Sequence, residues 1–312
     1  MKILITGCCG FIGSTLTEEL LCKGHKIIGI DNFDKFYSKK YKLQNIEKSL
    51  MYSNFQFIEG EVGNISILLE KKISIDVIIH LAASPGVRNS FENTSHCLYN
   101  NINETEKLLN FSINNNIKKF IFASSSSVYG VNNNLPWKEN EKLIPISPYA
   151  FSKLSCETLG QMYSSIYDIK FTALRFFTVY GPKQRPDLAI YKFFDRIVNN
   201  KKIQVYGKGD TFRDYTYIDD IIEGIINSIE INSNFEIFNL GNNRPTKLLD
   251  LLNSIERITN KRAIIEYMPL PKGDVPATYA DITKAKSLIN FSPKTKLEIG
   301  LKEFYDWYKS TR

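Results

Sequence analysis

The glycine-rich loop near the start of the chain constrains the fold more than any other feature. Residues 7–13 read Gly-Cys-Cys-Gly-Phe-Ile-Gly, so three glycines recur in GxxGxxG spacing. The loop follows a β-branched run at 2–6, precedes a helical apolar pattern at 11–23, and is succeeded by a second apolar run at 25–30. This order predicts a βαβ unit, in which the glycines let the backbone approach a pyrophosphate at the helix N-terminus.

Apolar runs that are typical of buried strands alternate with helical stretches beyond this unit. They recur at residues 55–59, 76–81, 119–123 and 171–176. The alternation predicts an α/β fold with a Rossmann-type doubly wound parallel sheet. After Gly181, segments rich in Pro, Gly and charge are mixed with helical patterns. We therefore expect a smaller mixed α/β C-terminal part that binds the substrate.

Asp31 ends the second apolar run and is the candidate contact for a dinucleotide ribose. A carboxylate at this position accepts hydrogen bonds from the adenosine ribose hydroxyls. It would repel a 2′-phosphate, and no arginine stands beside it in the sequence, so NAD is favoured over NADP. A glycine-rich turn with an incidental aspartate is the structural alternative, which the strand, loop and helix order disfavours.

Composition limits the classes of partner. The 312 residues include 40 Lys and Arg against 33 Asp and Glu, but the basic residues are scattered and form no stripe with aromatics. We predict a small anionic substrate and no nucleic acid. No apolar run approaches 18 residues, so we predict no membrane span. Five cysteines and three histidines show no metal-ligand spacing, which predicts no metal site and a cytoplasmic location.

Tyr149 and Lys153 form the candidate catalytic pair. They lie at i and i+4, so they share one face of a helix that Pro148 can begin. A phenol with a pKa near ~10 is a poor base at neutral pH. An ammonium nearby, together with the positive nicotinamide ring, lowers that pKa. The serines at 124–127 follow a strand end and offer hydroxyls to the reacting oxygen. A YxxxK pattern alone is common by chance, so its weight comes from the glycine loop, Asp31 and the serines.

These motifs resemble the extended short-chain dehydrogenase/reductase family of NAD-dependent nucleotide-sugar epimerases, dehydratases and decarboxylases. The resemblance runs nearly end to end and is carried by the three glycines, the His-Leu-Ala-Ala of 80–83, the serines before Val-Tyr-Gly at 128–130, and residues 147–153 and 213–220. Within the family the chain is most similar to UDP-glucuronate 4-epimerases, through residues 86–88, 175–182 with 185–187, and 273–278.

The resemblance implies a set of site residues. Ser125 is expected to join Tyr149 and Lys153 in catalysis. The expected cofactor-binding residues are Gly7, Gly10, Phe11, Ile12, Gly13, Asp31, Asn32, Glu61, Val62, Leu81, Ala82, Ala83, Asn101, Tyr149 and Lys153. The expected substrate-binding residues are Arg88, Ser126, Ser127, Thr178, Arg185, Gln204, Tyr206, Arg213 and Asp274. Glu61 departs from the usual Asp of the family, and Glu104 from the usual Gly.

The resemblance also implies a domain division and an assembly. Residues 1–180, with about 213–241, are expected to form the NAD-binding Rossmann domain. Residues 181–212 and 242–312 are expected to form the nucleotide-sugar-binding domain. A homodimer is expected through segments 98–113 and 150–167.

The residues after the catalytic hydroxyl separate the possible reactions. Dehydratases of this family place Asp-Glu there, and decarboxylases place Glu before the Val-Tyr-Gly, whereas this chain has Ser126 and Ser127. With Thr178, these hydroxyls suit the restraint of a uronate carboxylate. We therefore expect an NAD-dependent 4-epimerase that interconverts UDP-glucuronate and UDP-galacturonate. The alternatives are a UDP-glucose or UDP-N-acetylglucosamine 4-epimerase, a UDP-glucuronate decarboxylase, and a non-catalytic NAD-binding scaffold.

Overall fold

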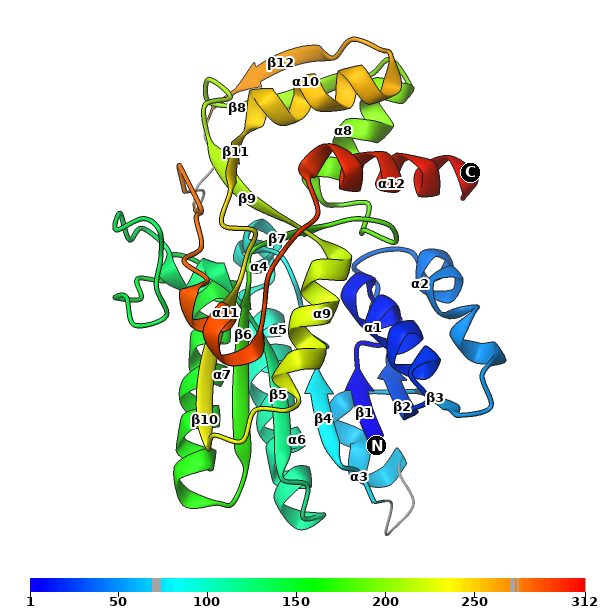
Figure 1. Ribbon diagram of the computed structural model, residues 1–312, viewed down its shortest axis with the longest axis vertical. Coiled ribbons are helices and arrows are strands. Elements are labelled where there is room, and N and C mark those ends of the chain that lie inside the picture. The colour runs from blue at the N-terminus through cyan, green and yellow to red at the C-terminus, as the bar shows by residue number, and fades with distance from the viewer. Residues whose placement is uncertain (69–73, 270–272, 274, 312) are drawn as a thin grey trace.

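A seven-stranded parallel sheet forms the centre of the molecule. The computed structural model describes residues 1–68, 74–269, 273 and 275–311. The strands follow the order β10-β6-β5-β4-β1-β2-β3, and every neighbouring pair is parallel (Figure 1). Their bounds are β1 Lys2–Thr6, β2 Lys26–Asp31, β3 Phe55–Glu59, β4 Val77–His80, β5 Lys119–Ser125, β6 Lys170–Phe176 and β10 Phe235–Leu240. The predicted Rossmann-type fold is confirmed.

Helices cover both faces of this sheet, which explains why its strands are near-continuous apolar runs. In β1, Ile3 and Ile5 pack into the core under α1 (Phe11–Cys22) and α9 (Ile218–Ser228), whereas Leu4 packs into the core under α6 (Glu104–Asn114) and α7 (Pro148–Ile166). The remaining helices at the sheet are α2 Lys39–Ile46, α3 Ile65–Leu68, α4 Val87–Glu92, α5 Thr94–Leu98, α6 Glu104–Asn114, α7 Pro148–Ile166 and α11 Thr283–Ile289. Short helical turns are η1 Ser49–Met51, η2 Val62–Asn64, η3 Tyr99–Asn103 and η4 Ser126–Tyr129.

The strand order reverses between β1 and β4. From β1 the chain proceeds to β2 and β3 on one side, and then crosses to β4, β5 and β6 on the other. The connections therefore leave the carboxyl ends of β1 and β4 in opposite directions. Ligands of doubly wound sheets bind in the crevice that opens at such a point.

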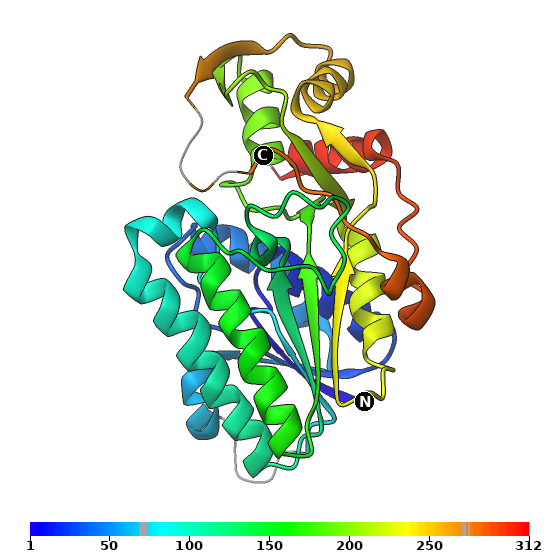
Figure 2. The same cartoon turned by 90° about the vertical axis from the view of Figure 1, so that its left-hand side faces the viewer.

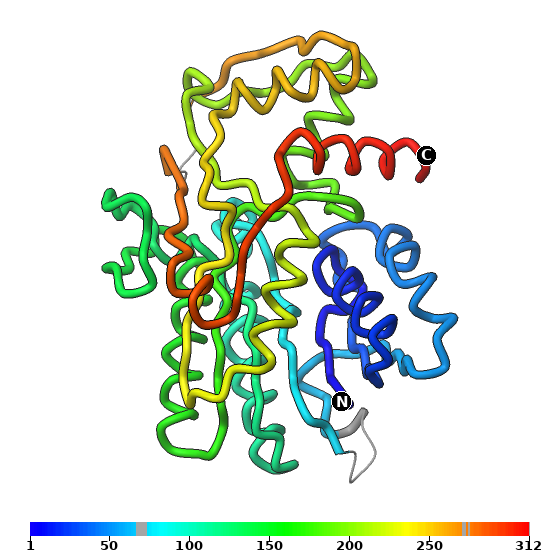
Figure 3. The backbone as a smooth tube through the Cα atoms, in the orientation of Figure 1, coloured from blue at the N-terminus to red at the C-terminus, as the bar shows by residue number. Residues whose placement is uncertain are grey.

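A smaller part lies beyond the carboxyl ends of the central strands (Figure 1). It contains a three-stranded sheet of β7 (Thr178–Tyr180), β9 (Phe212–Tyr217) and β11 (Pro245–Lys247), and a parallel pair of β8 (Lys202–Tyr206) and β12 (Ile264–Met268). Its helices are α8 Ala189–Val198, α10 Leu248–Thr259 and α12 Leu297–Ser310. Figure 3 traces how the chain returns through β9 and α9 to β10 at the edge of the central sheet.

One continuous extended segment joins the two parts. β6 ends at Phe176 in the central sheet, and β7 begins at Thr178 in the three-stranded sheet, with Phe177 between them. Phe176 is the register partner of Ser125 in β5. The strand register therefore brings the start of β7 next to the serines that follow β5.

Among the helices of the described residues, none combines the length and the hydropathy that a membrane crossing needs.

Candidate active site

The glycine loop passes close to the backbone that follows β4. Gly7 has φ +71°, and a Cβ there would lie 2.8 Å from the amide nitrogen of Ala82. A Cβ on Gly13 would lie 2.1 Å from the carbonyl oxygen of Gly7. The amides of the first turn of α1 have no acceptor within the helix. A bare backbone that leads into a helix N-terminus is a cradle suited to a pyrophosphate.

A single cavity at the carboxyl ends of the strands collects most of the expected cofactor-binding residues. Its walls include Gly7, Gly10, Phe11, Ile12, Gly13, Asp31, Asn32, Glu61, Val62, Leu81, Ala82, Ala83, Tyr149 and Lys153. These residues come from the ends of several different strands and from the helix α7. The chain segments are far apart in sequence, and the parallel sheet brings them to one edge.

Asn101 lies behind the wall of this cavity. Its side chain is 2% exposed and accepts a hydrogen bond from the amide of Ser84 at 2.7 Å. The Asn101 amide also donates to the carbonyl of Ser84 at 3.2 Å and to Ser152 Oγ at 2.8 Å. Asn101 therefore fastens the loop after β4 to α7, and it supports the cavity from outside rather than lining it.

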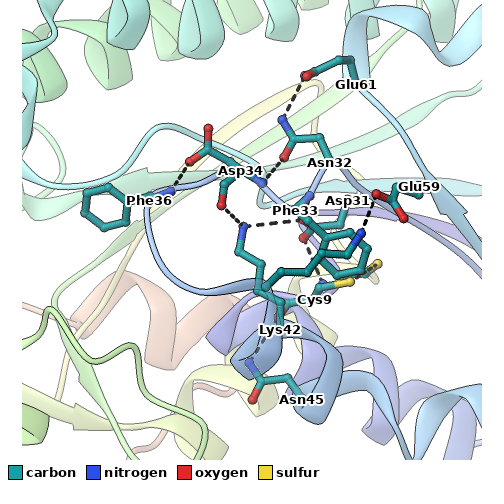
Figure 4. A network of polar contacts seen from close by, with 12 residues as sticks. Cys9, Asp31, Asn32, Phe33, Asp34, Phe36, Lys42, Asn45, Glu59 and Glu61 are labelled. Atoms are coloured by element: carbon teal, nitrogen blue, oxygen red, sulfur yellow. Dashed lines mark hydrogen bonds and ion pairs between the residues drawn. The ribbon is translucent and has the colours of Figure 1, made fainter.

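Asp31 is held by a small network, which Figure 4 shows. Its Oδ2 accepts the amide of Cys9 at 3.1 Å, and its Oδ1 accepts the amide of Phe33 at 2.9 Å. Lys42 Nζ lies 3.8 Å from Oδ1 and donates to the carbonyl of Asp34 at 2.9 Å. Burial raises the pKa of Asp31, while Lys42 and the two amides act against that rise. Sequence reasoning missed Lys42, because no motif links a lysine of α2 to the end of β2.

The two departures from the family pattern lie at the adjoining end of the same cavity. Glu61 accepts a hydrogen bond from Asn32 Nδ2 at 3.0 Å. Glu104 accepts the amide of Gly63 and pairs with Lys107 at 2.8 Å. Both carboxylates therefore already have partners within the protein.

Tyr149 and Lys153 lie on the first turns of α7. The helix begins at Pro148, and the hydroxyl of Ser147 accepts the amide of Ala150 at 3.1 Å. Lys153 is 3% exposed, its Nζ donates to the carbonyl of Ala123 at 2.7 Å, and it lies 5.9 Å from the centre of the Tyr149 ring. Burial lowers the pKa of Lys153 to about 8. The ammonium is thus the main form at neutral pH.

The pKa of the Tyr149 phenol depends on a charge that the sequence did not indicate, that of Arg185. Burial raises its pKa, whereas the Arg185 guanidinium and a hydrogen bond with the Ser125 hydroxyl lower it. Sequence reasoning gave the lowering effect to Lys153, which is instead committed to the carbonyl of Ala123. Arg185 also donates from Nε and from an NH2 group to Asp187, both at 2.9 Å. This pair keeps the guanidinium in place beside the phenol.

The four serines have different roles in the structure. Ser124 Oγ donates to Glu157 at 2.5 Å, and the side chain is buried, so its proton is not available to a ligand. Ser125 Oγ accepts the Ser127 amide at 3.2 Å and the Ser127 hydroxyl at 3.0 Å. Ser124 and Ser125 end β5, Ser126 and Ser127 begin the turn η4, and all four line the second cavity. The Ser124 hydroxyl thus donates to Glu157, whereas the hydroxyls of Ser125 and Ser126 are left to donate to a reacting oxygen.

A second cavity adjoins the first, and the two share Phe11, Ile12, Pro85, Ser124, Tyr149, Phe176 and Arg185. Its walls include the expected residues Arg88, Ser125, Ser126, Ser127, Thr178, Arg185 and Arg213. They also include residues that sequence reasoning missed, namely Trp137, Ile146, Phe177, Leu188, Val275 and Thr278. Apolar and threonine side chains in loops carry no local signal of a site. Tyr149 thus stands where the two cavities meet.

Two expected substrate-binding residues, Gln204 and Tyr206, are not among the described residues that line the cavity. Gln204 is exposed on β8, away from the cavity walls. Tyr206, also on β8, contacts Arg88 of the cavity wall, whose guanidinium lies 4.4 Å from the centre of the tyrosine ring. Arg213 lines the cavity and donates to the carbonyl of Phe212 at 2.8 Å. Asp274 lies outside the described residues.

Comparison with known proteins gives the same picture over the whole chain. The family model described as GDP-mannose 4,6 dehydratase matches residues 4–304. The UDP-glucuronate 4-epimerase of Thermodesulfobacterium geofontis is 39% identical over 313 residues, which cover 98% of this chain and 95% of the relative.

Solved structures extend the comparison. The crystal structure of UDP-glucuronic acid 4-epimerase from Bacillus cereus with UDP-glucuronic acid and NAD has a TM-score of 0.95 and 38% identity, with 100% of both chains covered. UDP-glucose 4-epimerase from Thermotoga maritima with UDP-glucose has a TM-score of 0.90 and 32% identity, with 100% of this chain and 99% of that chain covered. The chain therefore belongs to the GDP-mannose 4,6-dehydratase family of extended short-chain dehydrogenases/reductases, close to the UDP-glucuronate 4-epimerases.

Proposed function

We propose that this protein is an NAD-dependent 4-epimerase that interconverts UDP-glucuronate and UDP-galacturonate through a transient 4-keto sugar. The observation that carries the proposal is the position of Tyr149, with Ser125 beside it, where two cavities meet. The second cavity presents the hydroxyls of Ser126 and Ser127, where related dehydratases and decarboxylases carry acids, and the hydroxyl of Thr178. The similarity to the Bacillus cereus and Thermodesulfobacterium geofontis epimerases supports the same substrate.

The first cavity fits NAD. The glycine cradle and the first turn of α1 suit the pyrophosphate, and Asp31 suits the adenosine ribose. When bound, NAD⁺ accepts the hydride from C4 of the sugar and returns it to the other face of the ketone. We propose that residues 1–180 with about 213–241 bind this cofactor, and that 181–212 with 242–312 bind the nucleotide sugar.

Tyr149 is the proton acceptor for the C4 hydroxyl in this mechanism. Burial raises the pKa of the free phenol, and the Arg185 guanidinium and the hydrogen bond with Ser125 act against that rise by stabilising the phenolate. Lys153 keeps its proton below a pKa of about 8 and holds its ammonium on the same helix face. On the return step, the phenol gives its proton back to the C4 oxygen, so the base is restored at each turnover.

A uronate poses a risk that a neutral hexose does not. The 4-keto form is a β-keto acid, in which the bond from C5 to the carboxylate carbon can break. Its electron pair then moves into the C4 carbonyl, CO₂ leaves, and the resulting enolate takes up a proton at C5. The bond breaks only when it is aligned with the carbonyl π system. We propose that Ser126, Ser127 and Thr178 hold the carboxylate out of that alignment, and that Arg88 and Arg185 add positive charge.

We also propose a cytoplasmic homodimer. Helices α6 and α7 lie side by side on one face (Figure 2), and large apolar side chains on and beside them are exposed. They are Tyr99, Phe151, Met162, Ile166 and Tyr167. A second copy of this surface would bury them. The free thiols at Cys8, Cys9, Cys22, Cys97 and Cys156 suit a reducing compartment.

The test is a product assay with the pure protein. Incubation with UDP-glucuronate and NAD should yield UDP-galacturonate, resolved from UDP-pentose by chromatography. Faster turnover of UDP-glucose would favour the neutral-sugar epimerase, which the similarity to the Thermotoga maritima enzyme makes the second candidate. UDP-pentose as the main product would favour the decarboxylase. Binding of NAD without any NADH fluorescence on addition of sugar would favour a scaffold.

A further inference from the structure

A fully buried ion pair lies behind the serines of the site. Arg175 on β6 is 1% exposed and Glu157 on α7 is 3% exposed. Arg175 Nε donates to Glu157 Oε1 at 2.9 Å, and NH2 donates to Oε2 at 2.7 Å. Neither residue lines either of the two cavities among the described residues. The proton transfer proposed above uses neither of them.

Each partner of the pair reaches one end of the serine segment. Glu157 accepts the hydroxyl of Ser124 at 2.5 Å, where β5 ends. An NH1 group of Arg175 donates to the hydroxyl of Tyr129 at 2.9 Å, where the turn η4 ends. Ser125, Ser126 and Ser127 lie between these two anchors. The pair therefore fixes residues 124 and 129, and with them the hydroxyls that face the second cavity.

The network continues to other walls of that cavity. The Tyr129 hydroxyl donates to Asn239 Oδ1 at 2.7 Å, and its ring stacks on Trp137 with centroids 4.8 Å apart. Asn239 Nδ2 donates to the carbonyl of Trp137 at 2.8 Å. Trp137 itself lines the second cavity. Glu157 also lies one helical turn beyond Lys153, so the same carboxylate ties the catalytic helix to the serines.

Stability alone is a weak reason for such a pair. Desolvation of two charges offsets most of their attraction, and apolar residues of similar volume often replace buried ion pairs without loss of stability. Directional hydrogen bonds, by contrast, fix positions that apolar contacts leave free. The bidentate contact, with a third bond from each partner to the serine segment, is a geometry suited to positioning.

We propose that Arg175 and Glu157 are positioning residues that set how often the 4-keto sugar loses CO₂. By anchoring Ser124 and Tyr129, the pair holds Ser126 and Ser127 in the arrangement that keeps the carboxylate out of alignment. A looser segment lets the carboxylate rotate, so the bond from C5 breaks before the hydride returns. This inference rests on the proposed uronate 4-epimerase activity.

Tyr129→Phe is the sharpest test, because Tyr129 is fully buried and is not part of either cavity wall. Arg175 NH1 keeps the carbonyl of Glu139 as an acceptor at 3.0 Å, so the guanidinium is not stranded. We expect the ratio of CO₂ to UDP-galacturonate to rise about three- to tenfold, the effect of one such hydrogen bond. KM and the Kd of NAD should stay within about twofold, because the contact surfaces are intact.

The matched control is Tyr163→Phe, which removes a tyrosine hydroxyl on α7, the helix that carries Glu157. Tyr163 donates to Asn110 at 2.8 Å, far along α7 from the site, and its variant should keep the wild-type product ratio. Ser124→Ala cuts the other anchor and should raise the ratio as Tyr129→Phe does. Glu157→Gln should raise it further. If Glu157→Gln does not fold, the two single-anchor variants decide the matter.

The outcomes separate the two proposals. A wild-type protein that forms no UDP-galacturonate contradicts the proposed function before any variant is made. If the wild type does form UDP-galacturonate, the variants decide the positioning role. That role is overturned if Tyr129→Phe and Ser124→Ala give the same ratio of CO₂ to UDP-galacturonate as Tyr163→Phe. Lower turnover with an unchanged ratio would likewise assign the pair to stability alone.

Discussion

Replacement of Asp31 by Ala should change which dinucleotide the protein prefers. Asp31 offers the acceptor for the ribose hydroxyls, and Lys42 lies 3.8 Å from its carboxylate. Asp31→Ala removes the acceptor and leaves the ammonium of Lys42 without its counter-charge at the same position. NAD should then lose hydrogen bonds, while a 2′-phosphate should meet a cation in place of an anion.

The structure sets the size of the effect. Two unit charges 3.8 Å apart attract by roughly 4 kcal/mol at an effective dielectric constant near 20. Solvent and salt screen much of this in an open cavity, so we expect about 1.4 to 2.8 kcal/mol to appear in binding. The ratio of the Kd for NADP to the Kd for NAD should therefore fall about ten- to a hundredfold.

The assay is titration of the protein with NADH and with NADPH, followed by nicotinamide fluorescence or calorimetry. Asp34→Ala is the matched control, since it removes a neighbouring carboxylate and keeps both the pair of Asp31 with Lys42 and the backbone carbonyl that Lys42 contacts. Adding Lys42→Ala to Asp31→Ala should weaken NADPH again. The control for folding is a cooperative thermal unfolding transition of Asp31→Ala. If that folded variant keeps the wild-type ratio of the Kd for NADP to the Kd for NAD, the assignment of the ribose contact is refuted.

Three further outcomes are expected at the reacting end. Tyr149→Phe should retain NAD binding and lose at least about a hundredfold in turnover, because a positioned base contributes about 10² to 10⁴; near-normal turnover would contradict it. Burial lowers the pKa of Lys153 to about 8, so its ammonium persists below that pH and is lost above it; turnover should fall as the pH rises through 8, and Lys153→Ala should lack this upper limb in rate measurements across pH. Thr178→Ala should raise the fraction of UDP-glucuronate lost as CO₂ about tenfold or more, since each bond to a charged group is worth roughly 1.5 to 3 kcal/mol; CO₂ release equal to wild type would count against the carboxylate restraint.

The features that sequence predicted well are local ones. The glycine loop, the apolar runs of the strands and the start of α7 at Pro148 depend on spacing and propensity within a few residues, and the structure contains each of them. Lys42 beside Asp31 was not predictable, because α2 packs there through tertiary contacts.

The same limit applies to charge at the catalytic tyrosine. Helical spacing predicts that Lys153 shares a face with Tyr149, but it does not show that the ammonium is bonded to a carbonyl of β5. The nearby loop of Arg185 supplies the charge instead. Ser124 is a further example. A run of four serines gives no sign of which hydroxyl is hydrogen-bonded within the protein, and the structure shows that Ser124 donates to Glu157.

The passage of one extended segment from the central sheet into the three-stranded sheet limits how this site can diversify. Thr178 is two residues beyond Phe176, which is in register with Ser125, so one continuous segment positions the proposed carboxylate contact relative to the proposed catalytic serine. An inserted or deleted residue at Phe177 would turn the face of β7 by one position. New substrate preferences at this position can therefore arise by exchange of side chains, whereas a change in segment length would disturb the chemistry along with the specificity.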